Sequence, residues 1–77
     1  MKITATYIIK CSDLIKNSDM TIRDLVDDFP FLAGEEQSYI KLHYTVPCGF
    51  FIETRNGVIN NVADWEDSRI LDILYNY

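Results

Sequence analysis

Residues 50–62 are Phe50-Phe51-Ile52-Glu53-Thr54-Arg55-Asn56-Gly57-Val58-Ile59-Asn60-Asn61-Val62. Two runs rich in β-branched and aromatic residues flank the Asn56-Gly57 pair, and Asn-Gly between two such runs is the strongest local signal for a β-hairpin. This segment therefore predicts two antiparallel strands joined by a tight turn, against which the other elements can be placed.

The length of this turn decides which side chains face the core, because a shift of one residue moves every side chain to the opposite face. A two-residue loop at Asn56-Gly57 divides the apolar residues evenly between the two faces. A three-residue loop, Arg55-Asn56-Gly57, with Gly57 in the left-handed conformation of a bulge, places most of them on one face. These residues are Phe50, Ile52, Val58 and Val62. We therefore expect the three-residue loop.

Two further segments, residues 2–10 and 39–46, alternate with a period of two, which is typical of half-buried strands. Their inward sides carry Ile3, Ala5, Tyr7 and Ile9 in the first segment, and Ile40, Leu42, Tyr44 and Val46 in the second. The short connection through Pro47 predicts that residues 39–46 form an antiparallel meander with the hairpin. The place of the first strand stays open, either beside the last strand of the hairpin or between other strands.

Residues 21–29 change to the period of a helix, with an apolar stripe formed by Ile22, Leu25, Val26 and Phe29. Thr21 and Asp24 approximate a capping box, and Pro30 ends the helix. A second helix is expected near the C-terminus, with Asp64 as its cap, Trp65 near its entry and a stripe of Ile70, Ile73, Leu74 and Tyr77. The sequence thus predicts a single α+β domain over residues 1–77, with a four-stranded, mostly antiparallel sheet and two helices on one face.

The charge balance limits the classes of partner. The chain has 12 acidic and seven basic residues, a net charge of −5. Contact with phosphates requires clustered Lys and Arg, so we expect no direct binding to nucleic acid or to a membrane. No apolar run approaches the ~18–20 residues of a membrane span, and the first residues lack a signal-peptide pattern, so we expect a cytoplasmic location. Cys11 and Cys48 have no motif spacing, and free thiols are the default in a reducing compartment.

The sequence contains no recognisable catalytic or metal-binding pattern. His43 is the only histidine, which excludes most sites built on paired histidines and leaves no Ser-His-Asp arrangement to defend. The glycines are scattered one to a turn, so no phosphate-binding loop is expected. We therefore expect no catalytic residues, no metal, no cofactor and no enzymatic activity.

The acidic residues concentrate in the helical segments. Residues 13–36 hold seven acids against Lys16 and Arg23, and residues 64–72 hold four against Arg69. Helix capping explains part of this excess, but not the pairs Asp27-Asp28 and Glu35-Glu36 on either side of Phe29-Pro30-Phe31. Charge beside aromatic residues is typical of an interaction surface. The predicted protein-binding residues are Asp24, Asp27, Asp28, Phe31, Glu35, Glu36, Glu66 and Asp67.

A second predicted surface lies on the opposite side of the sheet. With the three-residue loop, Phe51, Ile59 and Ile8 point away from the core, beside Tyr39 and His43. Apolar side chains on the outer face of a sheet indicate that the face is covered, by residues 14–15, by a second copy or by a partner. The predicted dimer face comprises Phe51, Ile59 and Tyr39.

These features favour a non-enzymatic, acidic protein-binding domain that docks on a basic surface of another protein, such as a nucleic-acid-binding surface. In size, acidity and lack of catalytic motifs, the chain is similar in type to the small inhibitors made by phages and mobile elements, including anti-CRISPR and anti-restriction proteins. That similarity implies a DNA-mimic inhibitor acting in a host cytoplasm, and it assigns no residue a role. The alternative is a small homodimeric structural or accessory subunit.

Overall fold

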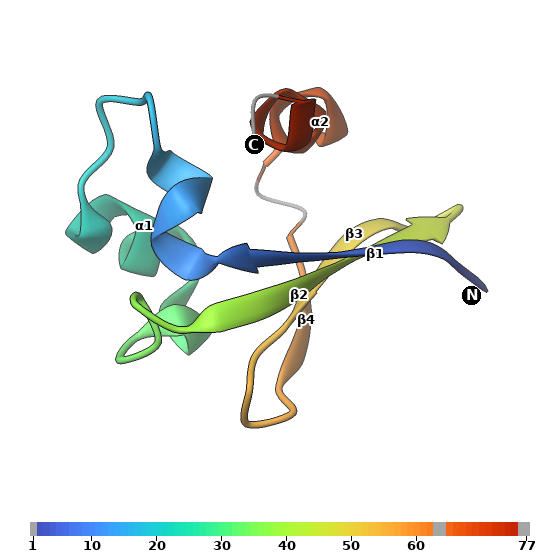
Figure 1. The fold of residues 1–77 in the computed structure, drawn as a ribbon, viewed down its shortest axis with the longest axis horizontal. Helices are drawn as coiled ribbons and strands as arrows, with labels where there is room; N and C mark the ends of the chain where they lie inside the picture. The colour runs from blue at the N-terminus through green and yellow to red at the C-terminus, as the bar shows by residue number, and fades with distance from the viewer. Residues whose placement is uncertain (1, 63–64, 76–77) are drawn as a thin grey trace.

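The structure, a computed structural model, describes residues 2–62 and 65–75. It contains a four-stranded antiparallel sheet and two α-helices (Figure 1), which confirms the predicted α+β class and element order. The strands are β1 (Lys2–Lys10), β2 (Tyr39–Val46), β3 (Gly49–Glu53) and β4 (Ile59–Asn61). The helices are α1 (Ile22–Asp28) and α2 (Asp67–Tyr75), with two short 3₁₀ helices, η1 (Cys11–Ile15) and η2 (Pro30–Leu32).

The β3–β4 hairpin has the predicted three-residue loop. Glu53 pairs with Ile59, the Thr54 amide donates to the Val58 carbonyl at 2.9 Å, and Gly57 has a φ of 80°. This register places Phe50, Ile52 and Val62 in the core, where all three are buried. Val58 shares their side of the hairpin but is exposed, because it lies at the loop end of the strands.

Strand β1 lies at the edge of the sheet and pairs with β2, so the order is β1-β2-β3-β4. This differs from both alternatives that the sequence left open, which placed the first strand beside the last strand of the hairpin or between other strands. Only one residue of its predicted inward stripe, Ile9, is buried, whereas Ile3 and Tyr7 are largely exposed. Ile9 lies where β1 enters η1, and Figure 1 shows η1 and α1 beside this end of the strand. The rest of the edge strand extends past the core.

Local signals account for the bounds of the helices. Thr21 and Asp24 form the predicted capping box, in which the Asp24 amide donates to Thr21 Oγ1 at 3.2 Å and the Thr21 amide donates to Asp24 Oδ2 at 3.1 Å. The chain leaves the helical conformation at Phe29, before Pro30. Helix α2 begins at Asp67, and Ile70 is its buried residue. The predicted cap Asp64 and stripe residue Tyr77 lie outside the described residues.

The hydrophobic core lies on one face of the sheet. Buried side chains from β1, β2, β3, the helices and the segment after β4 meet there, namely Ile9, Cys11, Leu14, Leu25, Phe29, Leu32, Ile40, Leu42, Phe50, Ile52, Val62, Trp65 and Ile70. Ile15 packs against the same cluster. Residues 14–15 therefore belong to the core and do not cover the outer face of the sheet.

The conformation of Gly57 gives a test of the hairpin register. Its φ of 80° is left-handed, and an added Cβ would meet nothing within 4 Å, so a substitution here acts through the backbone alone. We expect Gly57→Ala to lower the free energy of unfolding by about 1 kcal/mol, as measured by urea denaturation, because L-residues are strained in this region. Gly57→Asn is the control and should lose less, since Asn tolerates left-handed geometry. Equal stability of Gly57→Ala and the wild type would contradict the bulged loop.

Candidate functional site

The two α-helices are joined through the side chain of Trp65. Its indole Nε1–H donates to Asp28 Oδ2 at 2.9 Å, and its ring centre lies 4.9 Å from that of Phe29. The guanidinium of Arg69 lies 3.9 Å from the centre of the Trp65 ring, an attractive cation–π geometry. These contacts bring the last turn of α1 against the segment that enters α2.

Acidic side chains are carried by the two helical segments that this contact joins. Five of the eight predicted binding residues lie on α1 or at the start of α2, and all five are exposed: Asp24, Asp27, Asp28, Glu66 and Asp67. We call these five residues the acidic junction. Within residues 2–62 and 65–75, no ion pair joins any of them to Lys or Arg. The nearby cations are Arg23 on α1 and Arg69, whose guanidinium lies over Trp65. The junction therefore presents five carboxylates against two cations.

Glu35 does not belong to this exposed surface, which corrects the sequence-based expectation. Its side chain is buried, with a residue exposure of 8%. Asn56 Nδ2 donates to Glu35 Oε1 at 2.8 Å. Glu35 Oε2 lies 3.0 Å from Arg55 Nε in an ion pair. Because Glu35 is neutralised inside the molecule, it links the segment before β2 to the tip of the β3–β4 hairpin.

Glu36 and Phe31 are also set apart from the acidic junction. Glu36 is partly exposed and lies close enough to Cys11 to raise the pKa of its thiol. Cys11 is the first residue of η1, directly after β1. Phe31 is partly buried against the core, with its ring centre 6.0 Å from that of Phe29. Phe29 itself is buried. The aromatic residues on either side of Pro30 thus pack on the core, and they do not form the interaction surface that the sequence suggested.

The outer face of the sheet carries the predicted dimer residues. Ile8, Tyr39 and Ile59 are 63%, 62% and 57% exposed, and Phe51 is partly exposed. The strand register places them on the face opposite the core, as the three-residue loop predicted. The structure therefore brings together a second candidate surface that is separate from the acidic junction.

A polar network that sequence reasoning missed lies in this outer face. Thr6 Oγ1 lies 2.8 Å from His43 Nδ1, and His43 Nε2 lies 2.9 Å from Glu53 Oε1. With Glu53 ionised, Nε2 carries the proton and donates to the carboxylate, and Nδ1 accepts from the Thr6 hydroxyl. The only signal in the sequence was the outward position of all three residues, because their contact depends on the pairing of β1 with β2 and of β2 with β3.

The connectivity of this network is that of a hydroxyl–imidazole–carboxylate triad, but the backbone of its central strand offers no donors to an oxyanion. Acyl transfer requires hydrogen-bond donors aimed at the developing oxyanion. His43 lies on the central strand β2, whose backbone is paired with β1 on one side and β3 on the other. Backbone donors in this strand are therefore engaged in the sheet. The network instead holds Glu53 in place.

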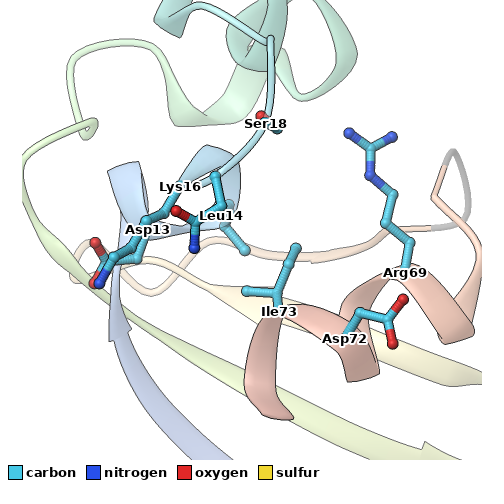
Figure 2. Close-up of a pocket in the computed structure, with 8 residues that line it drawn as sticks. Asp13, Leu14, Lys16, Ser18, Arg69, Asp72 and Ile73 are labelled. Carbon is cyan, nitrogen blue, oxygen red and sulfur yellow. The ribbon is translucent and has the colours of Figure 1, made fainter. Parts of the chain in front are cut away.

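A small surface cavity of about 210 Å³ lies between η1 and α2 (Figure 2). It is lined by Asp13, Leu14, Lys16, Asn17, Ser18, Arg69, Asp72 and Ile73. Figure 2 shows Leu14 and Ile73 facing each other across it, with Asp13 and Arg69 toward opposite ends. Its volume is below the ~300 Å³ at which ligand pockets begin, so we regard it as a packing crease.

No protein-family description, curated protein or solved structure matches this chain. Within residues 2–62 and 65–75, no helix has the length and apolar character needed to cross a membrane. The same residues contain no group of three or more His, Cys, Asp or Glu side chains placed to hold a metal ion. The acidic junction and the outer face of the sheet are therefore the two candidate sites.

The hydrogen bond between Trp65 and Asp28 can be tested by a double-mutant cycle. We expect Trp65→Phe and Asp28→Ala each to lower the free energy of unfolding, as measured by urea denaturation. In the double variant the two losses should overlap by about 0.5 kcal/mol or more, since either change alone breaks the same bond. Asp28→Asn is the control that keeps an acceptor oxygen, and it should lose less than Asp28→Ala. Strictly additive losses would contradict the bond.

The two thiols should differ in reactivity. Burial, with the nearby carboxylates of Glu36 and Glu35, raises the pKa of the Cys11 thiol from 9.0 to about 11, whereas Cys48 is exposed. At pH 8 we expect a thiol-specific reagent to label Cys48 rapidly and Cys11 only after denaturation, because the thiolate is the reactive form. A Cys48→Ser variant isolates the Cys11 signal. Fast labelling of that variant in its folded state would contradict the buried position.

The same pKa shift predicts how stability depends on pH. Between pH 9 and about 11 the folded chain keeps the Cys11 proton that the unfolded chain has lost. The contribution of this thiol to folding is therefore present below pH 9 and is lost as the pH rises through this range. Urea denaturation of the wild type and of Cys11→Ala should show a smaller difference in unfolding free energy at pH 10.5 than at pH 8.

Proposed function

We propose that this chain is a non-enzymatic binding protein whose acidic junction docks on a basic, nucleic-acid-binding surface of another protein. The carboxylates take the positions of nucleic-acid phosphates and thereby block that surface. In this view the chain is an inhibitor of the anti-defence type found in phages, and it acts in the host cytoplasm. It contacts the target protein and not the nucleic acid.

The observation that carries the proposal is the gathering of five exposed carboxylates that no Lys or Arg of the described residues neutralises. Asp24 and Asp28 also stabilise the fold, through the capping box and the hydrogen bond to Trp65. The other three are exposed charges of a kind that adds little to folding stability. They do create a negative field that attracts a basic partner and raises the rate of encounter. A surface of this kind is therefore better explained by association than by stability.

The fold supports the proposal because contacts within the molecule hold acidic residues of α1 in fixed positions. The indole N–H of Trp65 donates a charge-assisted hydrogen bond to Asp28, and the buried ring of Phe29 packs against the indole. Helix α1 is held at its other end by the capping box of Thr21 and Asp24. A preorganised group of charges loses less entropy on binding than a flexible acidic tail.

A second candidate function, a small homodimeric structural or accessory subunit, is favoured by the exposed apolar residues of the outer face. The two functions use different faces of the molecule. Each can therefore be tested by substitutions that leave the other surface intact.

The proposed inhibition can be measured with purified restriction enzymes and CRISPR effector complexes, each assayed for binding of duplex DNA. We expect the wild-type chain to compete with DNA for at least one of them, and the competition to weaken as salt rises, because screening acts on charge-driven contacts. A double variant, Asp27→Lys with Glu66→Lys, should bind about tenfold more weakly or worse, equivalent to about 1.4 kcal/mol.

The matched control is Asp19→Lys with Glu36→Lys, which changes the net charge equally but lies outside the acidic junction. It should compete within about threefold of the wild type, a difference of less than about 0.7 kcal/mol. Equal losses in the two double variants would mean that net charge alone is responsible. That result, or undiminished competition by the junction variant, would reject the acidic junction as the docking surface.

A further inference from the structure

The outer face of the sheet is exposed, and its side chains form rows with a regular order of residue types. The buried side chains of the sheet and of both helices form one cluster on the opposite face, and Figure 1 shows α2 standing on one side of the sheet. Ile8, Tyr39 and Ile59 remain more than half exposed on the outer side. Apolar side chains gathered on one face of a small protein usually mark an association surface.

One row of side chains crosses all four strands of this face. Ile8 pairs with Lys41, Lys41 pairs with Glu53, and Glu53 pairs with Ile59. In strand order the row is therefore apolar, cationic, anionic and apolar. The neighbouring row contains Thr6, His43, Phe51 and Asn61, and its order is polar, aromatic, aromatic and polar.

We propose that a second copy of this chain packs face to face on this outer surface, about a two-fold axis that runs along the strands midway between β2 and β3. In such an arrangement β1 lies opposite β4 of the other copy, and β2 lies opposite β3. Each contact then occurs twice, as in any two-fold interface. The axes of the two sheets stay nearly aligned, which is the common mode of sheet packing.

The two-fold operation makes the first row complementary to itself. Ile8 of one copy faces Ile59 of the other, and Lys41 of one copy faces Glu53 of the other. The second row behaves in the same way, since Thr6 faces Asn61 and His43 faces Phe51. Reversing the row places each charge opposite a charge of the other sign and each apolar residue opposite an apolar residue. The row is therefore complementary to its own two-fold copy.

The state of the two charges within one copy agrees with this arrangement. Lys41 and Glu53 are direct cross-strand neighbours, yet the described residues place only His43 within ion-pair distance of Glu53. The imidazole holds Glu53 Oε1 at 2.9 Å, which orients the carboxylate. Lys41 is exposed and makes no ion pair with the described residues. It therefore has a cationic end available for the second copy.

The size of the face suits a weak dimer. The four strands have nine, eight, five and three residues, and at about 3.4 Å per residue and about 4.8 Å between strands they cover about 400 Å². Two copies would therefore bury about 800 Å² in total, which is below the ~1,200 Å² of stable interfaces and in the range of weak ones that form at high concentration. This inference is independent of the proposed inhibition, because it concerns the opposite side of the molecule.

The charge pairing can be tested by mixing two variants. Lys41→Glu gives a copy with two carboxylates in the row, and Glu53→Lys gives a copy with two ammonium groups. We expect the wild type to sediment at twice its 9.0 kDa mass and each variant alone to sediment as a monomer at the same concentration. An equimolar mixture should recover the doubled mass, because opposite charges again face each other between copies. Thermal unfolding of each variant confirms that it is folded.

Substitution of an apolar residue of this face tests the proposal independently if either charge variant fails to fold. We expect Ile59→Asp to dissociate the dimer, whereas Leu71→Asp, on a residue of α2 that is 52% exposed, should leave it intact. The double variant Asp27→Lys with Glu66→Lys should also remain dimeric. A wild-type chain that sediments at 9.0 kDa at millimolar concentration would overturn the proposal. It would also be overturned if Ile59→Asp and Leu71→Asp dissociated the dimer equally. The same holds if the mixture of Lys41→Glu and Glu53→Lys stayed monomeric while the wild type was dimeric.

Discussion

The contacts of the Trp65 indole hold the C-terminal helix to the rest of the molecule. Helix α2 has nine residues, and helices of this length are marginal in water without tertiary packing. Ile70 supplies part of that packing from within the helix. The indole adds to it from just before the helix, because it is buried to 4% exposure, meets the Phe29 ring and donates its N–H to Asp28.

The one-sided construction of the fold explains why the molecule has two distinct surfaces. Two short α-helices and two 3₁₀ helices cover one face of a four-stranded sheet, and all of the large buried cluster lies there. The exposed sides of the helices carry carboxylates that favour solvent and basic partners. The opposite face keeps Ile8, Tyr39 and Ile59 exposed. Exposed carboxylates and exposed apolar side chains are thus separated onto opposite sides of the same small domain.

Carboxylates with similar sequence surroundings serve different purposes in this structure. Glu35 is buried and held by Asn56 and Arg55, since a buried charge is tolerated only with compensating partners. Glu53 is oriented by His43 on the outer face. The acids of the junction stay exposed and without Lys or Arg partners among the described residues. The difference between an internal link and an interaction surface therefore depends on what each carboxylate meets in space.

Local signals were sufficient for the elements and for the turn that joins β3 to β4. The alternation of residues 2–10 and 39–46, the capping pair of Thr21 and Asp24, and the Asn56-Gly57 turn each act within a few residues of the chain. The structure agrees with all of them. The helical period of residues 21–29 predicted the exposed acids of α1. The hairpin register predicted the outward position of Ile59.

Tertiary contacts alone decided the remaining features, because each one joins residues far apart in the chain. The pairing of β1 with β2 leaves β1 at the sheet edge, and Glu35 meets Asn56 across 21 positions. Trp65 meets Asp28 across 37 positions, as Thr6 meets His43. The period of a segment determines which face a side chain occupies, but only the packed chain determines which distant partner lies opposite. For this reason Glu35 looked like a surface residue in the sequence and became a buried link in the fold.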